Sequence, residues 1–560
     1  MIWEIAFFPS TCGAVGAIII GAQMGPSKWI LYYLTHKKVN GVRNMRQGEE
    51  TVTARLLKRF RSFRYILVIE GIGVGIAAGL VAVLFRIALE GAETARQYVR
   101  NFISLHPWAL LIWMLVLAGL AALVNMLLKW DAYISGSGIP QVEGELHGAL
   151  CQKWWRVLLA KLTGGVLAIG AGLSLGREGP SIQMGAMAGK GVSKLTRRGR
   201  TEEKMLMTCG ASAGLAAAFN APFAGVLFSL EELHKNFSVD VLLSSMSASI
   251  TADFISRYVF GLKPVFDFSA AQMMPLSSYW TVLVLGVLLG LAGALYNFCV
   301  RKSQDLYGKI KTKYLRLLIP FMIAGILLVV YPAVLGGGHN LVELVSQAQP
   351  LDFLILLFLM KFLFSMLSFG SGAPGGIFLP MLVLGAAAGS IFSGLMNSCG
   401  LDAHLQNFVI LGMAGLFSAI VRAPVTGIIL ISEMTGSFSH LLTLSLVSLT
   451  AYAVADLMHS RPVYDMLLSR LIRKDKPVQT GEKLLIESPV CYGSAACSKK
   501  VRELSWPGNA LIVSVKRQEN EIVPHGDTLL QAGDVIVLLC DEGQSREVYA
   551  ALEAQCKSSS

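Results

Sequence analysis

The sequence predicts an all-α polytopic membrane protein with an internal repeat and broken helices, followed by a small C-terminal α+β domain. Of its 560 residues, 54% are hydrophobic and only 15% are charged, whereas soluble proteins carry about 25% charged residues. Apolar blocks recur from about residue 63 to about residue 458. Glycine or proline breaks many of these blocks before they reach the ~20 residues that a membrane span needs. Beyond Pro477 the chain changes to short segments separated by turns.

The N-terminal segment, residues 1–44, precedes these blocks, and the sequence leaves two interpretations open for it. It is either an extra span or sequence upstream of a start at Met45. A signal peptide is not expected, because no small-residue cleavage site follows a compact apolar core. Residues 45–62 are basic, so the positive-inside rule predicts that this end is cytoplasmic.

The most informative stretch is 175–181, a polar interruption between two apolar segments. Glycines flank Arg177 and Glu178, and Pro180 suits the first turn of a helix. We therefore expect one helix to end here and another to begin, with its unpaired N–H groups facing the break. A carboxylate such as Glu178 at membrane depth is a candidate functional group. The alternative is a surface loop with an ordinary solvated glutamate.

An internal repeat relates two parts of the membrane region at an offset of about 200 residues. Gly136-Ser-Gly138 aligns with Gly336-Gly-Gly338, and 185–189 aligns with 385–389. With a slip of two residues, 221–225 aligns with 423–427, and Glu231 aligns with Glu433. Glu178 falls opposite Phe378. Duplicated halves with glycine-broken helices are how many transporters build an ion site near the midplane.

Four helix breaks or ends offer neutral donors to a bare anion. They are the Gly136–Gly138 break with the Ser137 hydroxyl, the break before Glu178, the backbone at Ile377 and Phe378, and the phenol of Tyr464. Neutral dipoles suit chloride because they replace its hydration water without holding it too tightly. Taken singly, Ser137 could be a helix cap and Tyr464 an interfacial aromatic.

Three further ionisable residues lie within apolar segments. Lys161 is expected to need a carboxylate partner at this depth. Glu231 and Glu232 are neighbours on a predicted helix, so they cannot face the same way. We expect one of them to lie inward and the other to pair with a base such as Lys235 or Lys161; an exposed pair at the helix end is the alternative.

The C-terminal region reads as a linker, 471–483, and a soluble domain, 484–556. Strands are predicted at 484–489, 510–515, 521–523 and 535–540, and helices at 501–504 and 545–553.

Several functional classes are not supported. The net charge of +12 comes without an aromatic-interleaved basic patch, so we expect no nucleic-acid partner. The nine cysteines are scattered, which predicts neither a metal site nor a disulfide framework. No nucleophile–base set points to an enzyme, and no cofactor is expected.

These motifs resemble the CLC family of chloride channels and chloride/proton antiporters over residues 63–470. The resemblance rests on GSGIP at 136–140, GREGP at 176–180, GGIFLP at 375–380 and the single Tyr464. It implies a homodimer in which each subunit is an inverted repeat with its own pathway. It also implies that Ser137, Ile377, Phe378 and Tyr464 bind chloride, that Glu178 is the gating glutamate and that Glu232 transfers protons internally. Seven further residues are expected to support these groups: Gly136, Gly138, Lys161, Gly176, Arg177, Gly179 and Pro180.

By the same resemblance, Ser137 indicates a preference for chloride, since a proline there would suggest nitrate. Gln141 departs from the glutamate found after this motif in some bacterial relatives. The C-terminal region resembles the TrkA C-terminal (RCK-C) regulatory domain, chiefly at 501–504 and 522–535. That likeness implies a possible regulatory ligand, such as a cytosolic nucleotide or metabolite, without naming it.

The expected function is therefore exchange of chloride for protons across a cell membrane, in a bacterial inner membrane in contact with lipids and with the C-terminal domain in the cytoplasm. A passive chloride channel of the same fold is the alternative, and Glu232 argues against it. A nucleotide-sensing receptor is a third interpretation, disfavoured because a sensor does not need the duplicated ion-site motifs.

Overall fold

The structure is a computed structural model that describes residues 52–474 and 483–557, except 236, 263, 267, 269–272, 402–403, 509, 519 and 542–543. The segment 1–44, the start of the basic segment 45–62 and most of the linker 471–483 lie outside the described residues. The predictions for them therefore stay predictions.

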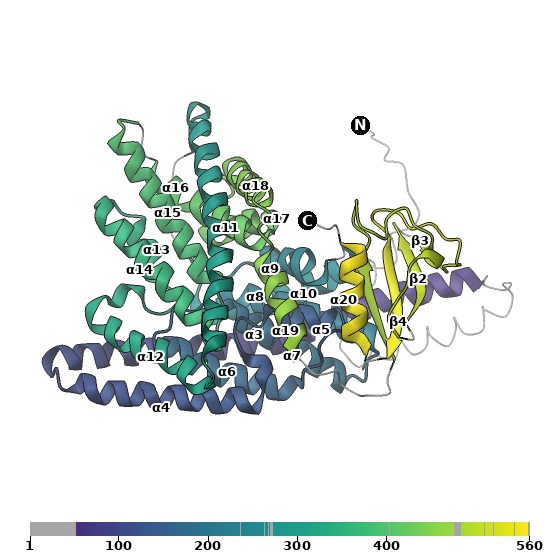
Figure 1. The fold of residues 1–560 in the computed structure, drawn as a ribbon, viewed down its shortest axis with the longest axis horizontal. Helices are drawn as coiled ribbons and strands as arrows, with labels where there is room; N and C mark the ends of the chain where they lie inside the picture. The colour runs from purple at the N-terminus through teal and green to yellow at the C-terminus, as the bar shows by residue number, and fades with distance from the viewer. Residues whose placement is uncertain are drawn as a thin grey trace, which may run out of the picture. The chain divides into compact units, whose positions relative to one another are not determined.

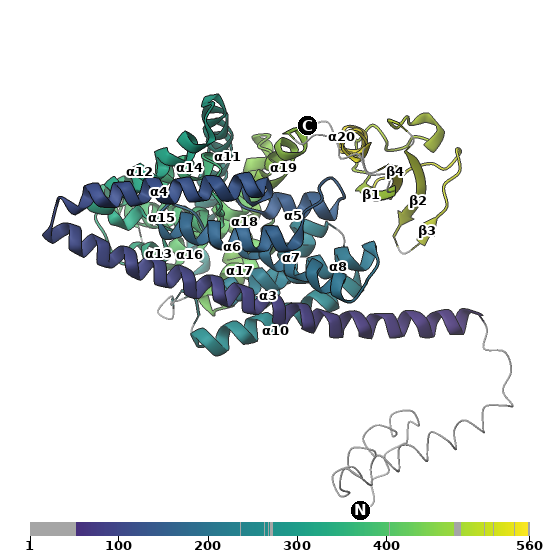
Figure 2. The same cartoon turned by 90° about the horizontal axis from the view of Figure 1, so that it is seen from below.

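The membrane region is built from helices, and the chain is a multi-pass membrane protein (Figure 1). Within the described residues, seven helical segments are long and apolar enough to cross a bilayer: Tyr65–Leu105, Ala109–Trp130, Val239–Phe260, Leu276–Lys309, Lys313–Val330, Leu351–Gly370 and Phe378–Ser398. Three shorter apolar helices, Leu405–Val421, Pro424–Thr435 and Leu441–Leu457, follow the last of them, as the interrupted blocks predicted. Figure 2 shows the first two as a helical hairpin, α3 (Val52–Leu105) followed by α4 (Ala109–Trp130).

The internal repeat is visible as the same order of elements in each half. The first half runs η2 (Ala132–Ile134), α5 (Ile139–Leu146), α6 (Trp154–Gly170), α7 (Glu178–Leu195), α8 (Arg200–Phe219), α9 (Pro222–Phe228), η3 (Ser229–His234) and α10 (Val239–Phe260). The second runs η5 (Pro332–Val334), α13 (His339–Val345), α14 (Leu351–Gly370), α15 (Phe378–Ser398), α16 (Leu405–Val421), α17 (Pro424–Thr435) and α18 (Leu441–Leu457). At the same offset, α12 (Lys313–Val330) before η5 corresponds to α4 before η2; η4 (Leu276–Ser278) and α11 (Tyr279–Lys309) precede α12, and α19 (Val463–Lys474) follows α18.

The repeat extends to single backbone angles. Gly136 and Gly336 have φ of 66° and 63°, and Gly138 and Gly338 have φ of 98° and 91°. Only glycine adopts such angles without steric cost. The sequence therefore encodes each short break before α5 and before α13 in the same way.

Small residues hold the central helices of each half close together. A Cβ added at Gly185 or Gly189 of α7 would strike the backbone of α8, and one at Gly385 or Gly389 of α15 would strike the backbone of α16. Helices in membranes associate through such close backbone contact. The matching glycine runs found in the sequence thus specify helix packing.

The C-terminal domain is a four-stranded antiparallel sheet with strand order β1-β4-β2-β3. Its strands are β1 (Lys483–Pro489), β2 (Leu511–Arg517), β3 (Asn520–Ile522) and β4 (Val535–Asp541), and its helices are η6 (Val501–Glu503) and α20 (Ser545–Cys556). α20 lies against the sheet (Figure 1). Ile486, Val515, Leu538 and Leu552 belong to the core between them. The predicted small α+β domain is confirmed.

Candidate functional site

The two central breaks meet each other in the middle of the membrane region. Gly176 N–H donates to Gly376 O at 2.7 Å, and Gly376 N–H donates to Gly176 O at 2.8 Å, which forms an antiparallel bridge. Gly375 N–H also donates to Gly136 O at 3.0 Å. Three glycine-rich breaks, predicted separately from the sequence, are therefore in direct contact.

Glu178 is the first residue of α7 and is completely buried. Arg177 Nε lies 4.0 Å from its carboxylate Oε1. The backbone N–H groups of Glu178 and Leu379 lie near the carboxylate, although neither oxygen reaches hydrogen-bond geometry with a group that the structure describes. A buried carboxylate without such partners is costly, so stability alone does not explain Glu178.

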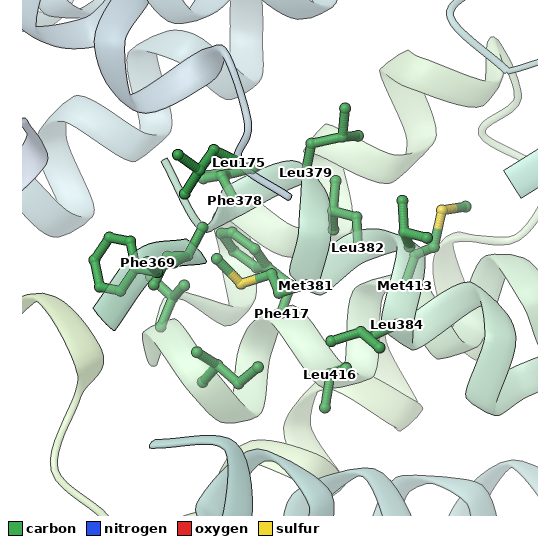
Figure 3. Packing of buried hydrophobic residues seen from close by; sticks show 14 of the residues in the cluster. Leu175, Phe369, Phe378, Leu379, Met381, Leu382, Leu384, Met413, Leu416 and Phe417 are labelled. Atoms are coloured by element: carbon green, nitrogen blue, oxygen red, sulfur yellow. The ribbon is translucent and has the colours of Figure 1, made fainter. Parts of the chain in front are cut away.

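The corresponding residue of the second half, Phe378, begins α15 and is also completely buried. Its ring centroid lies 5.3 Å from that of Phe219 and 4.9 Å from that of Phe417. Figure 3 shows this apolar packing around Phe378. One helix start therefore presents an acid to the region where the breaks meet, and the other presents an aromatic ring.

Two buried hydroxyl groups lie near these helix starts. Ser137 Oγ would be 2.5 Å from a Cβ at Gly179, so it lies directly against the first turn of α7. Tyr464, in the first turn of α19, is linked to Phe378 through Phe228, with ring centroids 6.3 Å and 6.0 Å apart. Neither hydroxyl has a hydrogen-bond partner among the described residues. Two buried hydroxyl donors without an acceptor among the described residues fit a small anion as their partner.

Lys161 corrects one prediction, because its partners are backbone carbonyls and not a carboxylate. Its Nζ donates to Ile134 O at 2.9 Å and to Gly136 O at 2.6 Å. An ammonium can satisfy its donors with carbonyl oxygens as well as with carboxylates. Lys161 thereby fixes the break that carries Ser137.

Glu231 and Glu232 have different environments, as expected for helix neighbours, but among the described residues Glu231 pairs with Thr426 and not with a base. Its Oε2 accepts from Thr426 N–H at 2.8 Å and from Thr426 Oγ1 at 2.7 Å, so it caps the start of α17. Glu232 is the buried member of the pair, and its Oε1 has no hydrogen-bond partner among the described residues. Tyr464 lies near enough to interact electrostatically with both Glu178 and Glu232.

The expected base, Lys235, instead bridges two acids that sequence reasoning missed. Its Nζ donates to Glu143 Oε1 and to Asp465 Oδ1, each at 2.7 Å. Both acids interact electrostatically with Glu232. Glu143 stands three residues after the GSGIP motif and Asp465 directly follows Tyr464, and this adjacency to the motifs was the available signal.

A cavity of about 420 Å³ reaches the other side of the helix starts. Its lining includes Arg96, Arg177, Leu379 and the Gly336–Gly338 break. Arg177 and Leu379 directly neighbour Glu178 and Phe378 in the chain. The cavity therefore lies one residue along the chain from each of the two helix starts.

Two family models and several known transporters match this chain. The family model described as "Voltage gated chloride channel" matches residues 119–456, and the TrkA-C domain matches 485–553. The H(+)/Cl(-) exchange transporter ClcA of Citrobacter koseri is 35% identical over 455 residues, covering 78% of this chain and 95% of that protein. ClcA of Salmonella typhimurium is 35% identical over 442 residues, covering 76% and 92%.

Solved structures show the same fold. A slow cyanobacterial Cl−/H+ antiporter superposes with a TM-score of 0.70 at 33% identity, covering 73% of this chain and 98% of that one. A eukaryotic CLC transporter superposes with a TM-score of 0.63 at 23% identity, covering 75% and 78%. The second likeness bears on the fold alone.

Proposed function

Since this chain belongs to the CLC family of chloride channels and chloride/proton exchangers, we propose that it exchanges chloride for protons across the membrane. The relatives that match it over nearly their whole length are H+/Cl− exchange transporters. Both ions follow from the chemistry of the buried groups, because hydroxyl donors suit chloride and carboxylates carry protons.

Chloride binds, in this proposal, between Ser137, Tyr464 and the backbone at Ile377 and Phe378. Support comes from the two buried hydroxyls, which have no acceptor among the described residues. The start of α15 adds partial positive charge from its unpaired N–H groups. Lys161 positions the Ser137 break by holding the carbonyl of Gly136.

Glu178 acts as the gate and as a proton carrier. When ionised it competes with chloride for the donors at the helix starts, and when protonated it leaves them. The observation that carries this proposal is the complete burial of a carboxylate at the first residue of α7, without a hydrogen-bond partner among the described residues. Such a group is retained for function and not for stability.

Glu232 carries protons on the other side of Tyr464. It is buried, like Glu178, and it lies within reach of the Lys235, Glu143 and Asp465 charges. A passive channel would have no use for a second buried acid on a separate branch.

The test is purified protein in chloride-loaded liposomes, with proton and chloride fluxes followed together. Under this proposal an outward chloride gradient drives protons inward against their own gradient at a fixed proton-to-chloride ratio. Chloride efflux that drives no uphill proton movement would assign the chain to the passive channels instead.

The assembly and surroundings follow the family. We propose a homodimer with one pathway in each subunit, embedded in a cell membrane with the C-terminal domain in the cytoplasm. That domain has the fold of a regulatory module, and a nucleotide or another cytosolic metabolite is its proposed ligand. Single-molecule mass measurement in lipid nanodiscs tests the dimer, and a nucleotide panel added during flux assays tests the ligand.

A further inference from the structure

The C-terminal domain packs on the membrane region beside the Glu232 branch. Leu150, Leu468 and Ile472 share one hydrophobic cluster with Ile486 and Leu538 of the sheet. A Cβ at Gly148 would lie 2.6 Å from Leu484 of β1. The ring centroids of His147 and Tyr549 are 6.3 Å apart. The domain therefore lies against the end of α5, the loop after it and one face of α19.

The polar centre of this contact is the Lys235 bridge. The Glu143 side chain is only 1% exposed, whereas those of Lys235 and Asp465 are each 28% exposed. Lys235 occupies the left-handed region, with φ of 52°, just after η3. This strained backbone brings its ammonium from the Glu232 segment to acids on α5 and α19. Strain of this kind persists where the surroundings enforce it.

The C-terminal domain adds its own charge to this cluster. Lys557 directly follows α20, and its Nζ lies 2.8 Å from Glu553 Oε1. Burial lowers the pKa of Lys557, but the carboxylates of Asp465 and Glu553 more than offset this, so the net pKa is raised. Asp465 thus interacts with two ammonium groups, one from each domain.

Tyr549 provides the uncharged part of the contact. It is only 7% exposed, and burial together with nearby carboxylates, Glu143 first among them, raises its pKa. Tyr549 therefore stays neutral and adds no charge to the cluster. A residue of the other domain therefore lies within electrostatic range of Glu143 and Asp465, the two acids beside Glu232.

We propose that the C-terminal domain completes the inner proton-loading site: Lys235 holds Glu143 and Asp465 beside Glu232, and Lys557, at the end of α20, supplies a second cation within electrostatic range of Asp465. This inference rests on the proposed function, because it needs Glu232 to carry protons. It makes Lys235 and Lys557 positioning residues, and it makes the C-terminal domain a part of the proton branch with no part in the chloride branch.

Lys235 tests the half of the site within the membrane region. Lys235→Met leaves Glu143 and Asp465 without their shared cation, and we expect the protons moved per chloride to fall by about tenfold, as when a buried charge pair loses one partner. Lys235→Arg keeps the cation and restores most of the ratio. An unchanged ratio in Lys235→Met would remove Lys235 from the site.

Lys557 tests the contribution of the C-terminal domain in the full-length protein. We expect Lys557→Met to lower the proton-to-chloride ratio about threefold, and Lys557→Arg to preserve it. If Lys557 acts through Asp465, the effect of Lys557→Met is largely lost in an Asp465→Asn background, because residues in one network are not additive. Equal effects of Lys557→Met in both backgrounds would contradict the proposed route.

The matched control is Lys500→Met. Lys500 and Lys557 have side chains that are each 40% exposed, and Lys500 pairs with the exposed Asp527. Lys500→Met should leave the ratio at the wild-type value. If Lys557→Met behaves like Lys500→Met while the wild type couples normally, this inference fails and the proposed function stands. A wild type that moves no protons uphill overturns both.

Discussion

The two halves of the membrane region share their framework and differ at a few buried positions. Lys361 repeats Lys161, with Nζ donating to Val334 O at 2.9 Å and to Gly336 O at 2.7 Å. Glu433 repeats Glu231, because it accepts from Phe223 N–H at 3.1 Å and from Ala224 N–H at 2.8 Å and so caps α9. Each half therefore caps a helix of the other half. Shared residues build the breaks and join the halves.

The differences fall at the proposed ion site. Glu178 stands opposite Phe378, Ser137 opposite Gly337, and Glu232 opposite Met434 when the two-residue slip is applied. All three residues of the first half are buried, and each has a polar side-chain atom without a hydrogen-bond partner among the described residues. The repeated residues therefore form the framework of the fold, and the residues without a counterpart are those proposed to bind chloride and to carry protons.

The largest effect is expected for Glu178, which begins α7 and has no acidic counterpart in the second half. Glu178→Gln removes the carboxylate that is proposed to carry protons at the start of α7, so uphill proton movement should fall by at least about 100-fold while chloride still passes. Dual-flux measurement in liposomes checks this. The counterpart Phe378→Leu should leave protons coupled. Chloride-driven proton pumping by Glu178→Gln would take Glu178 out of the mechanism.

A smaller effect, a loss of stability of the same size in both variants, is expected when either repeated lysine is replaced. Lys161→Met and Lys361→Met each remove two hydrogen bonds to buried carbonyls, which costs about 2 kcal/mol. The unfolding midpoint in detergent should then fall by about 4–8 °C in both variants. Intrinsic tryptophan fluorescence on heating measures it. A large loss in one variant alone would mean that the two lysines are not structural equivalents.

The next largest effect is expected for the hydroxyl groups of Ser137 and Tyr464. Ser137→Ala and Tyr464→Phe should each weaken chloride binding about tenfold, the value of one hydrogen bond to an ion. Isothermal titration with chloride measures this. Tyr307→Phe is the control, since Tyr307 is also buried with a hydroxyl that has no partner among the described residues, yet has no proposed role. Unchanged affinity in Tyr464→Phe would exclude its hydroxyl from the site.

The smallest effect is expected for Glu231 and Glu433, each of which caps a helix of the other half. Glu231→Gln and Glu433→Gln keep the shape of each cap but lose its charge, which costs about 1 kcal/mol. Both should lower the unfolding midpoint by about 2–4 °C and leave the proton-to-chloride ratio unchanged. A loss of coupling in Glu433→Gln would contradict the assignment of repeated residues to structure.

Much of this arrangement follows from the sequence, because glycine breaks and helix-start prolines are local signals. The repeat placed Glu178 opposite Phe378, and the structure puts both at the first residue of a helix. Contacts between residues far apart in the sequence could not be predicted from local sequence patterns. A carboxylate was expected for Lys161, whereas the carbonyls of its own half satisfy it. Sliding the chain by 200 positions would have revealed Lys361, but no local pattern joins Lys235 to Asp465.

Two adjacent residues test most directly whether the unrepeated residues are the ones that carry protons and bind chloride. Glu231 is repeated in the second half and Glu232 is not. Proton and chloride fluxes should therefore be measured side by side in Glu231→Gln and Glu232→Gln. We expect Glu232→Gln to stop proton transport and keep chloride flux, while Glu231→Gln retains the wild-type ratio. Full coupling in Glu232→Gln, or its loss in Glu231→Gln alone, would contradict the account.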